Sequence, residues 1–193
     1  MKILIFSENC SDAHKESIRR ITDELKRRGH AVHSLSVMQE DAPSLQQPSL
    51  RRRMMQKKYH EAALREYAGK LKKQLEADSY DVIIACHITC AKALSTLYQS
   101  EECFFPFMVY VSSGDELPSS KQLFSCDAYI VRSENEKNAL VRRGVASGLI
   151  HLLDAAGHES AQICEIIENE GKQWEELKRV FYVGLRKAEY SPD

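Results

Sequence analysis

The stretch Lys2-Ile-Leu-Ile-Phe-Ser7, followed by Glu8-Asn-Cys-Ser-Asp-Ala-His14, decides the fold of this 193-residue chain. The apolar segment breaks into small polar residues, and apolar residues then recur at helical spacing at Ile18, Ile21 and Leu25. This pattern predicts a strand, a tight loop and a helix, which is the opening of a doubly wound α/β domain. Ligands of such domains bind at the carboxyl ends of the strands.

Strand-like and helical segments continue to alternate beyond this opening. Further strands are expected at His30–Val37, Tyr80–Cys86, Phe104–Ser112, Asp127–Val131 and Gly148–Leu153. Helices are expected over Leu50–Ala77, as one long helix or two short ones, over Ala91–Tyr98, and from a capping box at Ser133–Glu136 to Gly144. The alternation predicts an α/β fold: a Rossmann-like, doubly wound parallel sheet of five or six strands with helices on both faces. The default strand order for such a sheet is 3-2-1-4-5.

A chain of this length is expected to form one well-buried core. Residues 1–157 form the predicted Rossmann-like domain, and residues 158–193 form a helical extension of it. The extension is predicted to contain two helices, Ser160–Glu168 and Gln173–Lys187. The second helix carries Trp174, Leu177, Phe181 and Leu185 on one face, so the extension should pack back on the domain.

The composition excludes several classes of protein. The 27 basic and 28 acidic residues nearly cancel, so bulk nucleic-acid binding is not expected. The six cysteines are scattered and no secretory signal precedes them, which is typical of reduced thiols in a cytoplasmic protein. The segment Cys86-His-Ile-Thr-Cys90 offers too few ligands for zinc, and no metal is expected.

No apolar run approaches the ~20 residues needed to span a bilayer, so any membrane contact is expected to be peripheral. One segment suits an anionic lipid surface, because Met54 and Met55 lie among basic residues. Its basic residues are Arg51, Arg52, Arg53, Lys57 and Lys58. The alternative is a solvated charged face whose methionines pack inward.

The loops exclude the common nucleotide sites, so no cofactor is predicted. Residues 7–14 contain no glycine of the kind that a dinucleotide or a phosphate loop requires, and no P-loop pattern is present. Polar residues nevertheless follow three strands. The catalytic candidates are His14, as a base, and Asp115. The candidates for ligand binding are Asn9, Ser11, His87, Thr89, Ser113 and Glu116.

His14 is the strongest of these candidates. It continues the apolar stripe of the first helix backwards by one turn, so it should point toward the rim of the sheet. A helix N-terminus disfavours the charged imidazole, which leaves a neutral ring able to accept a proton from a hydroxyl group. The alternatives are that His14 only fills the rim of the sheet and that His87 is a hydrogen-bonded turn residue.

The same motifs resemble the monogalactosyldiacylglycerol synthase and processive diacylglycerol glucosyltransferase family, which has the GT-B fold. The resemblance rests on Ile3-Leu-Ile-Phe-Ser7 with His14, on Asp81-Val-Ile-Ile-Ala-Cys-His87, and on Phe105-Pro-Phe-Met-Val-Tyr-Val111 followed by Asp115. It continues from Cys126-Asp-Ala-Tyr-Ile-Val-Arg-Ser133 to Arg143-Gly-Val145 and covers residues 1–154. In that family this half of the protein binds the acceptor, and the histidine after the first loop is a candidate base.

Two departures from the family leave two functions open. Cys10-Ser-Asp-Ala13 replaces the family's glycines before the histidine, and the half that binds the nucleotide sugar has no counterpart. The first interpretation is an acceptor-side domain of a glycosyltransferase, with a lipid or glycan acceptor, that needs a separate donor-binding subunit. The second is a non-catalytic ligand-binding or regulatory module with the same fold.

Overall fold

The structure is a computed structural model of residues 1–193. It describes the backbone of residues 1–8, 11–37, 50–100, 106–111, 126–155 and 157–189, and the side chains of these residues outside 50–60, 98–100 and 178–189. The elements in chain order are β1 (Lys2–Glu8), α1 (Asp12–Arg27), β2 (Ala31–Val37), α2 (Leu50–Ala77), β3 (Val82–Ala85), α3 (Ile88–Ser100), β4 (Phe107–Tyr110), β5 (Ala128–Val131), α4 (Glu134–Arg142), the short 3-10 helix η2 (Ser147–Leu149), β6 (Ile150–Leu152) and α5 (Glu159–Glu189).

The strands form one parallel sheet, as the sequence predicts, but in a different order. The order is β2-β1-β3-β4-β5-β6, so the default order 3-2-1-4-5 is wrong. The physical reason is burial. Every residue of β3 is buried, whereas most residues of β2 are exposed or half-buried. A strand with two buried faces belongs in the centre of the sheet, next to β1, and the polar β2 can occupy the edge.

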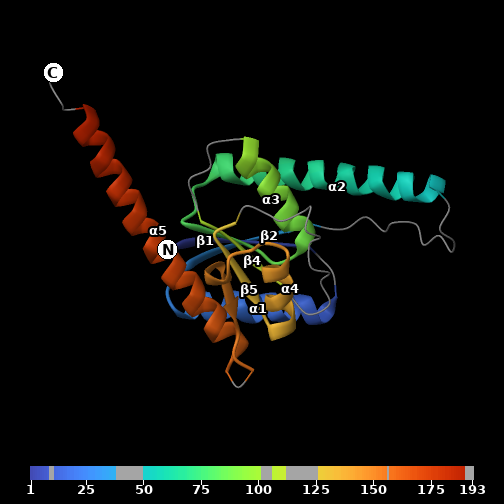
Figure 1. Ribbon diagram of the computed structural model, residues 1–193, viewed down its shortest axis with the longest axis horizontal. Helices are drawn as coiled ribbons and strands as arrows, with labels where there is room; N and C mark the ends of the chain where they lie inside the picture. Colours follow the sequence, from blue (N-terminus) through green and yellow to red (C-terminus); the bar gives the residue numbers. More distant parts are fainter. Residues whose placement is uncertain (9–10, 38–49, 101–105, 112–125, 156, 190–193) are drawn as a thin grey trace.

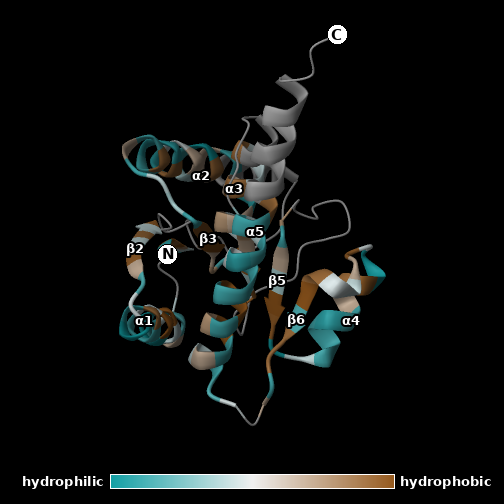
Figure 2. Cartoon of the chain, turned by 90° about the vertical axis from the view of Figure 1, so that its left-hand side faces the viewer, coloured by the Kyte–Doolittle hydropathy of each residue, from teal (hydrophilic) through white to brown (hydrophobic). Residues whose placement is uncertain are grey.

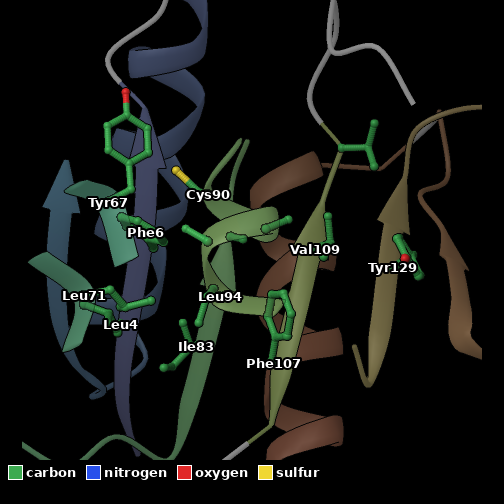
Figure 3. Packing of buried hydrophobic residues seen from close by; sticks show 14 of the residues in the cluster. Leu4, Phe6, Tyr67, Leu71, Ile83, Cys90, Leu94, Phe107, Val109 and Tyr129 are labelled. Carbon is green, nitrogen blue, oxygen red and sulfur yellow. The ribbon is translucent and has the colours of Figure 1, made fainter. Parts of the chain in front are cut away.

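Helices cover both faces of the sheet (Figure 1). Helices α2, α3 and α4 pack on one face, where Leu4, Phe6 and Ile83 form a core with Tyr67 of α2 and Leu94 of α3 (Figure 3). Helices α1 and α5 pack on the other face. Ile21 and Leu25 of α1 are almost fully buried there, as the apolar stripe of the first helix predicts.

Capping residues set the boundaries of α1 and α4. The Ser11 side chain accepts a hydrogen bond from the backbone N–H of His14, and Gly29, just after α1, has a φ of 84°. The capping box of Ser133 and Glu136 is present at the start of α4.

Residues 159–189 form one helix, α5, and not the two predicted helices. Gly171 lies within this helix, and the absence of a side chain there allows α5 to approach the sheet: a Cβ would lie 2.6 Å from Met1 Sδ and 3.2 Å from Val82 Cγ2. The first part of α5 does pack back on the domain, with hydrophilic residues on its outer side (Figure 2). Leu177 is 51% exposed, so the predicted apolar face is not covered there.

Candidate functional site

A pocket of about 510 Å³ opens at the carboxyl edge of the sheet, on the face that α1 and α5 cover. The first turns of α1 contribute His14 and Ser17, the last residue of β4 contributes Tyr110, and Arg132 follows β5. The start of α5 completes it. The full lining is Ala13, His14, Glu16, Ser17, Arg20, Ile21, Tyr110, Arg132, His158, Glu159 and Ser160. The volume is that of a small-molecule site, and the location is where ligands of parallel α/β sheets bind.

His14 forms part of the pocket wall, as its place on the apolar stripe predicts. Its residue is 6% exposed, because α1 directs the ring toward the sheet. The N-terminal end of α1 carries partial positive charge, which disfavours a second positive charge on the imidazole. A neutral imidazole at a pocket wall can accept a proton from a bound hydroxyl group.

Tyr110, Arg132 and Glu159 form a polar cluster in the lining of the pocket. The Tyr110 hydroxyl donates to Glu159, and Arg132 Nε lies 3.4 Å from Glu159 Oε1. Burial, followed by the bond to Glu159, raises the pKa of Tyr110, so the phenol remains protonated at neutral pH. Ser17 Oγ lies 3.5 Å from the same hydroxyl and connects the cluster to α1. This cluster can therefore donate and accept hydrogen bonds without carrying an uncompensated charge.

A second polar group lies at the same edge of the sheet and is centred on Glu8, the last residue of β1. Its carboxylate is 1% exposed, and His87 Nδ1 lies 2.5 Å from its Oε2. The Tyr67 hydroxyl donates to Oε1 at 3.2 Å, and Thr89 adds a side-chain hydrogen bond. Burial raises the pKa of Glu8, but the hydrogen bond and charge of His87, together with Thr89 and Tyr67, outweigh it and hold that pKa below its ordinary value. Glu8 is therefore a buried carboxylate at neutral pH.

The pocket lining and the polar group around Glu8 are adjacent at His14 and His87. The rings of His14 and His87 are 6.2 Å apart between centroids and lie at 83°, edge to face. This contact exists because β1 and β3 are neighbours, so that the segments after both strands emerge side by side. The arrangement runs from the buried Glu8 through His87 to His14 and the pocket.

The structure brings some of the predicted site residues together. His14 and His87 converge, and Thr89 lies beside them through Glu8. Ser11 caps α1, which is a structural role, and its predicted ligand binding stays a prediction. The other predicted residues, Asn9, Ser113, Asp115 and Glu116, and the side chains of the basic segment, Arg51, Arg52, Arg53, Lys57 and Lys58, lie outside the described residues.

Sequence reasoning missed Glu8, Tyr110, Arg132 and Glu159. A signal for Glu8 exists: it ends the strand that carries the apolar run Ile3–Phe6, and a carboxylate that is buried at such a position requires a partner. His87, which follows the other central strand, is that partner. Glu159 could not be found in this way, because its position depends on where α5 begins relative to β4.

The described cysteines are consistent with the reduced state. Cys86, Cys90 and Cys164 are buried, Cys126 is half-buried, and these four described cysteines form no disulfide. Among the side chains that the structure describes, no group of three or more His, Cys, Asp or Glu residues is arranged to hold a metal ion. No helix in the described part of the chain is long and apolar enough to cross a membrane.

Comparison with known proteins gives structural likeness only. No model of a protein family matches the chain, and no curated protein sequence matches it. Sucrose-phosphate synthase from Thermosynechococcus elongatus superposes with a TM-score of 0.59 at 18% identity, over 90% of this chain and 98% of that one. The lipopolysaccharide outer core galactosyltransferase WaaB, in its apo form, gives 0.54 at 12% identity, over 78% of this chain and 44% of that one. UDP-GlcNAc 2-epimerase from Neisseria meningitidis, bound to UDP-GlcNAc, superposes with a TM-score of 0.52 at 14% identity, over 93% of this chain and 52% of that one.

These likenesses establish the fold. The chain is an α/β, Rossmann-like domain of the GT-B type, and it spans about half the length of the galactosyltransferase and of the epimerase. At 12–18% identity they carry no activity across to this chain.

Proposed function

We propose that this chain is the acceptor-side domain of a GT-B-type glycosyltransferase and that the pocket at the carboxyl edge of its sheet binds the acceptor. The observation that carries the proposal is the position of His14, a histidine of a helix N-terminus that lines a pocket of about 510 Å³. The fold of the domain and its likeness to a galactosyltransferase and to sucrose-phosphate synthase support it.

The chemistry follows from the pocket wall. An acceptor hydroxyl attacks the anomeric carbon of a donor sugar, the bond from that carbon to the nucleoside diphosphate breaks, and the hydroxyl proton must go to a base. His14 would take this proton. Tyr110, Ser17 and Ser160 supply hydroxyl groups that suit a polyhydroxyl ligand such as a sugar or the head group of a glycolipid.

The donor site would come from a second domain, carried by another chain or by another part of a longer protein. In a two-domain transferase the base and the donor phosphates face each other across a cleft, so neither half reacts alone. The resemblance to the diacylglycerol glycosyltransferases makes a glycolipid the first acceptor class to examine.

A ligand-binding experiment tests the proposal. Saturation-transfer NMR with methyl glycosides of common hexoses and with short-chain diacylglycerol should detect binding to the wild-type chain and a loss of up to about tenfold in affinity in His14→Gln, since the hydrogen bond from the ligand to the imidazole is lost or weakened. His151→Gln is the matched control, because His151 pairs with Glu170 and is absent from the pocket lining.

The outcomes separate the candidate functions. No binding by the wild-type chain to any of these compounds would contradict the acceptor role. Binding that His14→Gln leaves unchanged would favour the alternative, a ligand-binding module in which this histidine is not a base.

A further inference from the structure

The Glu8–His87 pair is a buried ionisable group that acceptor binding alone does not explain. A buried carboxylate costs folding free energy unless it is paired, and an apolar pair of the same volume would avoid the cost. Glu8 ends the central strand β1 and receives hydrogen bonds from Tyr67 and Thr89 in addition to His87. The carboxylate is thus held by partners from α2, from α3 and from the segment between β3 and α3.

The two ends of the Glu8–His87 pair differ in their exposure to solvent. The negative end, Glu8, is 1% exposed, and the other end, the His87 side chain, is 21% exposed. The His14 ring lies against His87, with 6.2 Å between the ring centroids. The His87 end of the pair is therefore the end that His14 meets.

We infer that Glu8 and His87 are positioning residues that act on the pocket through His14: the carboxylate holds a proton on His87, and the charge on His87 keeps His14 neutral. Two imidazoles in contact disfavour a second positive charge, and the carboxylate decides which of the two carries the first. His14 is then available to accept a proton from a hydroxyl group in the pocket. Only this last step rests on the proposed function.

Other charged groups near the two rings could also affect the protonation of His14 and His87. On the pocket side the titratable and charged residues are Glu16 and Arg20 of α1, Tyr110 of β4, Arg132 after β5, and His158 and Glu159 at the start of α5. Glu16 is bonded to Arg20 and Arg19, and Glu159 to Tyr110 and Arg132. On the other side Tyr67 is neutral, because burial and the charge of Glu8 raise its pKa. Glu8 is the carboxylate that contacts His87, so the inference rests on it.

Histidine NMR on the free protein tests the inference without any acceptor. With ¹⁵N-labelled histidine, the protonation of each ring nitrogen is followed from pH 5 to 9. In the wild-type chain His87 should hold its proton to higher pH than His14. In Glu8→Gln the midpoint of His87 should fall by about one pH unit or more, and the midpoint of His14 should rise.

Opposite movements of the two midpoints are the signature that a structural role would not give. Asp78→Asn is the matched control, since Asp78 Oδ2 lies 3.5 Å from His33 Nδ1 in a second carboxylate–histidine pair. It should leave the midpoints of His14 and His87 unchanged. A His14 midpoint that Glu8→Gln leaves in place overturns the inference.

A second variant covers the case in which Glu8→Gln does not fold. In His87→Gln the neighbouring charge is removed while the glutamine can still donate to Glu8, so the midpoint of His14 should again rise. An unchanged or lower midpoint in this variant overturns the inference as well. Because both readings use the free protein, their failure is distinguishable from a failure of acceptor binding.

Discussion

Asp127 and Phe107 exchange two hydrogen bonds at the amino edge of the sheet: the Asp127 N–H donates to the Phe107 carbonyl at 2.9 Å, and the Asp127 carboxylate accepts from the Phe107 N–H at 2.7 Å. Asp81 and Lys2 repeat the arrangement between β3 and β1, at 2.8 and 2.7 Å. In both cases the aspartate immediately precedes a strand and bonds to the first residue of the neighbouring strand. This pair of hydrogen bonds aligns the two strands, and the carboxylate accepts from a backbone N–H group that has no partner within the strand pairing.

Asp127→Ala should lower the free energy of unfolding by about 1–3 kcal/mol, because a buried N–H loses its charged acceptor. Asp127→Asn should lower it by less than about 1 kcal/mol, since the amide oxygen still accepts. Urea unfolding monitored by circular dichroism measures both. Equal losses in the two variants would show that the hydrogen bond is not what Asp127 contributes.

The same residue predicts a pH effect. Burial raises the pKa of Asp127 above its ordinary value, so the folded state favours the protonated form. A raised carboxyl pKa gives stability that is present at low pH and is lost as the pH rises through the folded pKa. The stability of Asp127→Asn relative to the wild type should therefore increase from pH 3.5 to pH 7. A constant difference across this range would contradict the assignment.

Gly171→Val should destabilise the fold by about 1–3 kcal/mol, because its side chain would enter the contact between α5, Met1 and Val82. Gly69→Val in α2 is the matched control, since no atom lies within 4 Å of a Cβ there. That change should be neutral or slightly stabilising because valine has a higher helix propensity than glycine. Thermal unfolding compares the two, and similar shifts in Tm would contradict the close approach of α5.

Acid should weaken the ion pairs that Glu24 forms with Arg27 and Arg28 at the C-terminal end of α1. Hydrogen bonds from Arg27 and Arg28 lower the pKa of Glu24 to about 2. A lowered carboxyl pKa gives stability that is present above the unfolded value, near 4.5, and is lost as the pH falls toward 2. Glu24→Gln should therefore lose less stability than the wild type between pH 5 and pH 2.5. Glu176→Gln, on the exposed surface of α5, should behave as the wild type does.

Liposome flotation tests the basic segment at the start of α2. Arg51→Glu combined with Arg52→Glu should reduce binding to vesicles that contain anionic lipid by at least about tenfold, since each basic residue near such a surface contributes ~1 kcal/mol. Vesicles of neutral lipid alone should bind neither protein. Equal binding of the variant and the wild type to anionic vesicles would remove the membrane proposal.

Calorimetry with UDP, UDP-glucose and UDP-galactose tests the division of the transferase into two halves. The chain alone should not bind these compounds at micromolar concentration and should transfer no sugar to diacylglycerol vesicles, because residues 7–14 lack a glycine-rich phosphate loop. Tight binding or turnover would show that this domain carries the donor site.

The sequence predicts the fold well because the periodicity of Lys2–Ser7 and of the helix that contains His14 is dictated by burial. It does not predict the order of the strands, since the choice of neighbour for β1 depends on comparing the burial of β2 and β3. It predicts His14 and His87 as candidate site residues because each follows a strand. That their rings meet depends on β3 lying beside β1, which the default strand order does not give. The close approach of Gly171 to Val82 is a tertiary contact, which the sequence alone does not show.

The position of β1 between β2 and β3 also determines the order in which these strands can pair during synthesis. The Lys2–Asp81 hydrogen bond joins residues 79 positions apart, so a chain emerging from the ribosome can pair β1 with β2 long before β3 exists. During that interval one edge of an apolar central strand is open to association with other chains. The arrival of β3 closes the edge and brings His87 to Glu8 in the same event. The chain is thus most vulnerable to aggregation during synthesis up to that point, and the site is complete only after it.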